Sequence, residues 1–182
     1  MKKLLFLFLL LPVMALAQNE KQDSLLGIMP QIDGKVHYQG IVKVDSVNQK
    51  TLYSRAKLFF SDIFVSGKSV IDMQDEASGI IVGKGYLAEP VPVTNVPFTF
   101  KIQVKDGRYK YDIYDLLIKT ERIQCGYNLF IPETETSIEQ SEYAYSKSKR
   151  VKKRLAAINA KFEALIELLK SSMQQNKAEN DW

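Results

Sequence analysis

The chain has 182 residues, of which 46% are hydrophobic and 10% aromatic, with 25 lysines and arginines against 21 aspartates and glutamates. This length predicts one domain, or one domain with an appendage, and this apolar share excludes a disordered or low-complexity chain. A single histidine and a single cysteine exclude most metal sites, histidine-based triads and disulfide frameworks. The sequence therefore specifies no catalytic reaction, but it does indicate a cellular location and a fold class.

Residues 1–17 are predicted to be an export signal. Lys2 and Lys3 precede an apolar run from Leu4 to Met14, and Ala15-Leu16-Ala17 has the small-x-small pattern of a signal-peptidase site. The apolar run is too short for a membrane span of about 20 residues. We therefore expect cleavage before Gln18 and a periplasmic or secreted protein with no transmembrane span in the mature chain.

The net charge of the mature chain is small. Removal of Lys2 and Lys3 leaves 23 cationic against 21 acidic side chains, or 23 − 21 = +2. Such a charge gives no general attraction for nucleic acid or anionic lipid, so only a local patch could supply one. We expect no nucleic-acid partner.

The first elements after a disordered leader at residues 18–34 are predicted to be a strand and a helix. Residues 35–45 alternate between apolar and polar, as in a half-buried strand. Ser46 and Gln49 are spaced as a capping box. The apolar residues from Leu52 to Phe64 then follow a helical period, and Gly67 is the expected end of that helix.

Strands are predicted next, at residues 69–75 and 80–88 and in a hairpin over residues 98–117. The pair Asp106-Gly107 favours a two-residue type I′ turn, which fixes the register of that hairpin. In this register apolar residues face apolar residues. Lys101 falls opposite Asp112, and we expect these two to form an ion pair.

The C-terminal part is predicted to contain a long helix. Residues 120–132 are ambiguous, whereas Ser137 to Gln175 has a helical pattern with a heptad-like seam from Val151 to Leu169. A helix of this length exceeds the sheet it covers. It must either break, near residues 146–148, or project beyond the core, and the tail at residues 176–182 is expected to fray.

The chain resembles an exported family of unknown function that has a TBP-like fold and is common in Bacteroidetes. The residues that carry this resemblance are Tyr38 to Asp45, Leu52-Tyr53-Ser54-Arg55-Ala56, Ser69-Val70-Ile71, Gly79-Ile80-Ile81-Val82-Gly83-Lys84-Gly85, Phe98-Thr99-Phe100 and Lys105-Asp106-Gly107-Arg108-Tyr109. The resemblance implies a fold and no catalytic residues. The label "TBP-like" describes topology and does not imply DNA binding.

We therefore expect an α+β domain of order β-α-β-β-β-β-α at residues 35–118. It would have a curved, five-stranded antiparallel sheet with two helices on one face. The second of these helices would lie in residues 119–175, which hold a connecting segment and the long helix. The other face of the sheet would remain open and polar.

No catalytic, cofactor or metal site is predicted. His37 is expected to face solvent, and Cys125 to be a buried, inert thiol because its neighbours are apolar. Asp112 and Asp115 are expected to point away from each other. The segment Gly83-Lys84-Gly85 lacks the spacing of a phosphate loop. No cofactor is therefore expected.

The only concentrated charge is a basic run near the start of the long helix. Six of eight residues there are cationic, either as a solvated helix face or as a site for an acidic partner. The members are Lys147, Lys149, Arg150, Lys152, Lys153 and Arg154.

The sequence favours a non-enzymatic exported binding or interaction module. It would use the open sheet face and the basic helix to bind an unknown envelope protein or an acidic surface. The alternative is a cell-envelope hydrolase or transferase with an unrecognised site. A deep pocket with converging polar groups would favour the enzyme.

Overall fold

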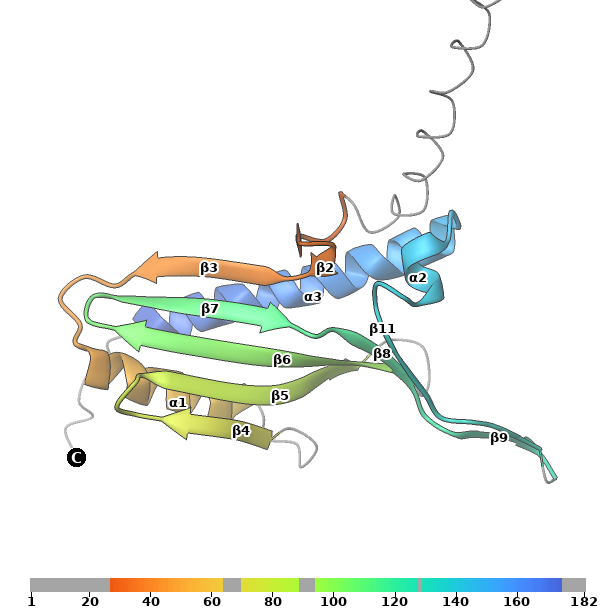
Figure 1. Cartoon of the computed structure of the whole chain (residues 1–182), viewed down its shortest axis with the longest axis horizontal. Coiled ribbons are helices and arrows are strands. Elements are labelled where there is room, and N and C mark those ends of the chain that lie inside the picture. Colours follow the sequence, from red (N-terminus) through yellow and green to blue (C-terminus); the bar gives the residue numbers. More distant parts are fainter. Residues whose placement is uncertain (1–26, 64–69, 89–93, 128, 175–182) are drawn as a thin grey trace, which may run out of the picture.

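The computed structural model describes residues 27–63, 70–88, 94–127 and 129–174 (Figure 1). The predicted export signal, Gly67 and the tail lie outside these residues. In chain order the elements are β1 (Gln31–Ile32), β2 (Lys35–Val36), β3 (Tyr38–Lys43), α1 (Gln49–Ile63), β4 (Val70–Asp75), β5 (Ile80–Ala88), β6 (Thr94–Lys105), β7 (Arg108–Tyr114), β8 (Leu117–Thr120), β9 (Ile123–Gly126), β10 (Leu129–Ile131), β11 (Thr134–Ser137), α2 (Glu142–Tyr145) and α3 (Lys149–Gln174).

Five antiparallel strands form the centre of the main sheet in the order β3-β7-β6-β5-β4. The predicted α+β order is thus confirmed, but the main sheet has seven strands rather than five in the part of the chain that the structure describes. The additional strands exist because β6 is longer than β7. Beyond the end of β7, Thr94 and Asn95 of β6 pair with β8, and β8 pairs with β11.

The β6–β7 hairpin has the register that the Asp106-Gly107 turn predicts. Val104 pairs with Tyr109 and Phe100 pairs with Ile113, so apolar side chains meet on the core side. Gly107 has a φ of 70°, a conformation that glycine adopts without steric cost. The turn also contacts the start of α1, because Asp106 Oδ1 accepts a hydrogen bond of 2.7 Å from the Gln49 backbone N–H.

Both long helices lie on one side of the sheet, behind it in the view of Figure 1. Phe59 and Phe60 of α1 pack on Phe100, with ring centroids 5.9 and 5.5 Å from it. Phe162 of α3 packs on Phe98 of β6, with ring centroids 5.2 Å apart. The core therefore fills the space between the helices and the apolar face of the sheet, as the sequence pattern indicated.

The start of α1 differs from the sequence prediction. The Thr51 backbone N–H donates to Asn48 Oδ1 at 2.8 Å, so Asn48 caps the helix rather than Ser46. Ser46 adopts a φ of 64° in the preceding turn. The capping-box interpretation is therefore wrong.

The N-terminal leader is also more ordered than predicted. Residues 27–34 contain a buried Met29 and the strand β1, which pairs with β2 across the turn at Asp33 and Gly34. The expectation of a disordered leader is therefore wrong for these eight residues.

The long C-terminal helix breaks where the sequence allowed a break. A short α2 ends at Tyr145, residues 146–148 are not helical, and α3 begins at Lys149. The buried side chains of α3 run from Leu155 to Met173, so the first turn of the helix contributes no buried side chain to the core. In Figure 1 this end of α3 extends beyond the sheet beside α2.

Candidate functional site

The sheet face opposite the two long helices is not covered by any described helix or strand (Figure 1). We call it the open sheet face. Its central side chains come in four rows across β3, β7 and β6, because antiparallel pairing places directly opposed residues on the same face. The rows are Lys43–Arg108–Lys105, Ile41–Lys110–Gln103, Gln39–Asp112–Lys101 and His37–Tyr114–Thr99.

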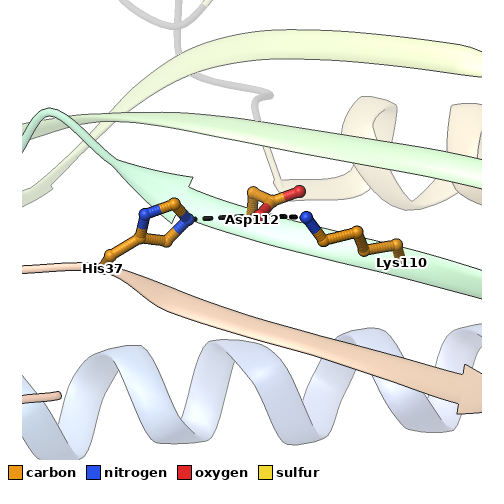
Figure 2. Close-up of polar contacts among 3 residues, drawn as sticks. All are labelled: His37, Lys110 and Asp112. Carbon is orange, nitrogen blue, oxygen red and sulfur yellow. Dashed lines mark hydrogen bonds and ion pairs between the residues drawn. The ribbon is translucent and has the colours of Figure 1, made fainter. Parts of the chain in front are cut away.

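Asp112 lies between the polar side chains of His37 and Lys110 on this face (Figure 2). His37 Nε2 lies 3.1 Å from Asp112 Oδ1, and Lys110 Nζ lies 3.0 Å from the same oxygen. The Asp112 side chain is only 10% exposed, and the His37 side chain is 25% exposed. A carboxylate this buried is stabilised by opposite charge and hydrogen-bond donors, which Lys110 and His37 supply.

Two predictions about these residues are therefore wrong. Lys101 faces Asp112 across the hairpin as expected, but Asp112 pairs with Lys110 and His37 instead of Lys101. Lys110 competes successfully because it lies two residues along the same strand and on the same face. His37 is half-buried rather than open to solvent, and its ring lies 5.8 Å from that of Tyr114.

A cleft of about 660 Å³ opens beside His37, between the β1–β2 turn, the end of β7 and the segment that leads into α2. Its polar lining includes Asp33, Tyr114, Asp115 and Glu139. Burial, followed by the Asp115 and Asp112 carboxylates, raises the pKa of Tyr114, so its hydroxyl stays protonated at neutral pH. Glu139 also has a structural role, because its Oε1 accepts a hydrogen bond of 2.7 Å from the Val36 backbone N–H.

Three cations face one another at the other end of the open sheet face. Arg108 of β7 lies directly opposite Lys43 of β3 on one side and opposite Lys105 of β6 on the other. We call these three residues the cation row. All three are exposed. None forms an ion pair with another residue of the described ranges. Directly opposed like charges destabilise a sheet, so this row breaks a local rule of strand pairing.

A shallow depression adjoins the cation row. It has a volume of about 230 Å³ and is lined by Ile41, Gln103, Lys105, Arg108, Tyr109 and Lys110. Ile41 is 69% exposed, although it lies in the middle of a strand. The cation row therefore borders an exposed aliphatic side chain and an amide. The predicted hairpin register places Lys105 opposite Arg108, but the sequence did not show that β3 would pair with the other side of β7.

The basic run at the start of α3 is largely exposed. Lys147, Lys149, Arg150, Lys152 and Lys153 are all exposed. The first turn of α3 contains no acidic residue, although the positive end of the helix dipole disfavours cations there. Arg154 differs from the others, because it is half-buried and its guanidinium lies 4.9 Å from the ring centre of Tyr143 in α2.

Cys125 does not have the predicted environment. It is exposed, and so are the nearby apolar side chains Tyr127, Leu129 and Phe130. The expectation of a buried thiol is wrong, because the β9–β10 pair projects from the molecule instead of packing on the core (Figure 1).

Among the described residues, no group of three or more histidine, cysteine, aspartate or glutamate side chains is arranged to hold a metal ion. Within the same ranges, no helix combines the length and the apolar character that a membrane span requires.

Comparisons with known proteins identify the fold. The chain is similar to the crystal structure of a DUF4468 family protein from Bacteroides ovatus, with 13% identity and a TM-score of 0.58 over 84% of this chain and 94% of the other. It is also similar to the crystal structure of a TBP-like protein from Parabacteroides distasonis, with 14% identity and a TM-score of 0.65 over 81% and 98%. No curated protein matches the chain. Residues 38–119 match the family described as a domain of unknown function (DUF4468) with TBP-like fold.

Proposed function

We propose that the protein is a non-enzymatic binding module whose open sheet face takes an acidic segment of a partner protein. The cation row carries this proposal. The row places three exposed cations on three neighbouring strands, with no acid of the described residues paired to them. An arrangement that costs stability in the free protein becomes favourable when carboxylates lie between the cations.

The surroundings of the row support an acidic peptide rather than a bare ion. The exposed Ile41 and the depression beside it offer an aliphatic contact, and the Gln103 amide offers both a donor and an acceptor for a backbone. Charged groups at such a site mainly set orientation and association rate, whereas the apolar contact adds affinity.

We propose that the basic run of α3 is a second contact for acidic partners. Its exposed members at Lys149, Arg150, Lys152 and Lys153 have no acidic residue in their own first turn. Arg154 is left out of this surface because it packs on Tyr143. α3 lies behind the sheet in Figure 1, so one short peptide is expected to use one surface or the other.

A fluorescein-labelled peptide of ten glutamates tests the proposal by anisotropy. Replacing Lys43, Lys105 and Arg108 together by Gln should weaken binding by about tenfold or more, since each exposed pair contributes up to about 1 kcal/mol. The affinity should fall steeply with salt, because these charges are exposed. Asp112→Asn should tighten binding, because it removes the acid that neutralises Lys110.

The matched control replaces Lys35, Lys57 and Lys161 by Gln. These lysines are exposed and lie in β2, α1 and α3 rather than in the three strands of the cation row, and the change in net charge is the same. The control should leave the affinity nearly unchanged. Equal losses in both triple variants would mean that only net charge matters, and the proposed site would then be wrong. A further variant measures how much the basic run contributes to the affinity for the peptide. It replaces Lys149, Arg150, Lys152 and Lys153 by Gln.

We also propose that the protein is exported and that residues 1–17 are removed. The charged start, the short apolar run and the small-x-small pattern support this. N-terminal sequencing of the protein from the periplasm or the medium should begin at Gln18. A chain that keeps Met1 in the cytoplasm would contradict export and would leave the binding proposal to be judged on its own experiment.

A cell-envelope hydrolase or transferase is the second candidate. The observation that favours it is the pairing of His37 with the buried Asp112 beside a cleft of about 660 Å³, since an imidazole oriented by a carboxylate is a common general base. Hydrolysis of p-nitrophenyl acetate that is abolished by His37→Gln and retained by Lys43→Gln would support this role. A rate equal to that of free imidazole would not.

A further inference from the structure

The paired strands β9 and β10 form a two-stranded ribbon that belongs to no larger sheet. We call residues 122–127 and 129–131 the ribbon. Figure 1 shows it extending away from the main sheet and from both long helices. An isolated two-stranded ribbon is only marginally stable in water, and it normally packs an apolar face on something else. Nothing among the described residues covers this one.

The ribbon exposes large apolar side chains at its end. Tyr127 at the turn is 99% exposed, Leu129 is 63% exposed, and Phe130 and Ile131 are exposed as well. Ile131 lies directly opposite Ile123, so these two aliphatic side chains share a face, and Leu129 pairs with Gly126 beyond a shift in the register. Such a concentration of exposed apolar surface at a projecting tip marks an interaction site.

The ribbon also lacks charge where it projects. Residues 123–132 contain no charged side chain, although 25% of the chain is charged. Charges resume at the base, where the Arg122 guanidinium lies 4.0 Å from the ring centre of Phe130 and Lys119 Nζ lies 2.6 Å from Glu133 Oε1. An uncharged tip suits the acyl-chain region of a lipid surface, and a charged base suits its polar headgroup region.

We propose that the tip of the ribbon inserts into a lipid surface and holds the protein there. Each strand has three or four residues, so a depth of about 5–10 Å takes in the last two or three of them at about 3.3 Å per residue. Tyr127 at the turn would enter first, and its amphipathic ring suits the boundary between the headgroups and the acyl chains.

The size of the ribbon argues against a second copy of the chain as the occupant. Its two short strands offer a few hundred Å² at most, whereas a stable protein interface buries about 1,200 Å² or more. A lipid surface requires no complementary shape. The ribbon shares no residue with the cation row, so the failure of either binding experiment would leave the other proposal unaffected.

Tyr127→Trp in the full-length protein, combined with Trp182→Phe, provides the test. Trp182 is the only natural tryptophan, so the emission then reports on the tip alone. Vesicles of phosphatidylcholine should shift the emission to the blue. Because the tip itself is uncharged, the fraction bound should change little between about 50 and 500 mM salt. An emission maximum unaltered by vesicles would overturn the proposal.

Matched serine variants identify the surface that binds. Leu129→Ser with Ile131→Ser should reduce co-sedimentation with the vesicles by about tenfold or more. Leu58→Ser with Leu168→Ser removes two exposed leucines from the helices and should change nothing. Binding only to anionic vesicles, lost in high salt, would contradict insertion. So would a dimer in sedimentation equilibrium that the ribbon variant abolishes, since the ribbon would then join two copies.

Discussion

Gly40 of β3 lies directly opposite Tyr111 of β7, and the Tyr111 ring occupies the space that a β-carbon at Gly40 would need. Such a β-carbon would come within 2.6 to 2.7 Å of the Tyr111 hydroxyl oxygen and two of its ring carbons. Gly40→Ala should therefore lower the free energy of unfolding by about 1–3 kcal/mol, as overpacked positions do. Urea denaturation measures the change.

A double-mutant cycle identifies the cause of that loss. If the clash with the Tyr111 ring is responsible, Gly40→Ala should cost much less in a Tyr111→Val background. Gln39→Ala, at the exposed neighbouring position, should be nearly neutral. An undiminished cost in the Val background would assign the loss to the backbone of β3 instead.

The two faces of β6 should differ sharply in tolerance to an acid. Phe100 is fully buried, whereas Lys101 lies on the open sheet face. Phe100→Asp should cost about 3–5 kcal/mol of unfolding free energy, because it buries an unpaired carboxylate. Lys101→Asp should cost less than about 1 kcal/mol. Thermal or urea denaturation of the two variants compares them, and equal losses would contradict the assigned strand parity.

Two buried tyrosines should respond in opposite ways to loss of the hydroxyl. The Tyr38 hydroxyl donates to Asn159 Oδ1 at 2.7 Å, whereas the Tyr109 hydroxyl is buried and has no partner among the described residues. Tyr38→Phe should cost about 1 kcal/mol, and Tyr109→Phe should leave stability unchanged or raise it. A loss at Tyr109 as large as at Tyr38 would mean that the hydroxyl has a partner, such as a buried water.

Stability should decline at alkaline pH through the same two tyrosines. Burial, and secondly the Glu163 carboxylate, raises the pKa of Tyr38 above its ordinary value of 10.0. Burial likewise raises the pKa of Tyr109. The folded protein keeps these protons more tightly than the unfolded chain, so the stabilisation is complete below pH 10 and is lost as the pH rises above it.

Denaturation of Tyr38→Phe at pH 8 and at pH 11 isolates this effect. The variant should lose less stability between the two pH values than the wild type, and the double variant with Tyr109→Phe should lose least. An identical decline in all three proteins would place the alkaline sensitivity elsewhere.

The sequence specified the parts of the fold that depend on local signals. The Asp106-Gly107 turn fixed the β6–β7 register, and the spacing of Phe59 and Phe60 indicated the helix face that meets Phe100. The break before α3 followed from a helix too long for the sheet. The cap of α1 was missed because Ser46 and Asn48 both suit a cap, and the turn conformation of Ser46 decides between them.

The site depended on contacts that are remote in the sequence. His37 meets Asp112 only because β3 pairs with β7, and the same pairing brings Lys43 beside the Lys105–Arg108 pair of the predicted hairpin. The local pattern likewise could not show that β9 and β10 project. Apolar neighbours of Cys125 are equally consistent with a core strand and with an exposed ribbon.

Chemical-shift mapping of the ten-glutamate peptide on the ¹⁵N-labelled protein tests most directly whether the open sheet face binds acidic segments. The amides of Ile41, Lys43, Gln103, Lys105 and Arg108 should show the largest shifts, with a second, separate set at the start of α3. The shifts at the cation row should disappear when Lys43, Lys105 and Arg108 are replaced by Gln. Shifts confined to the cleft around His37 and Glu139, or an unchanged spectrum at saturating peptide, would contradict the account.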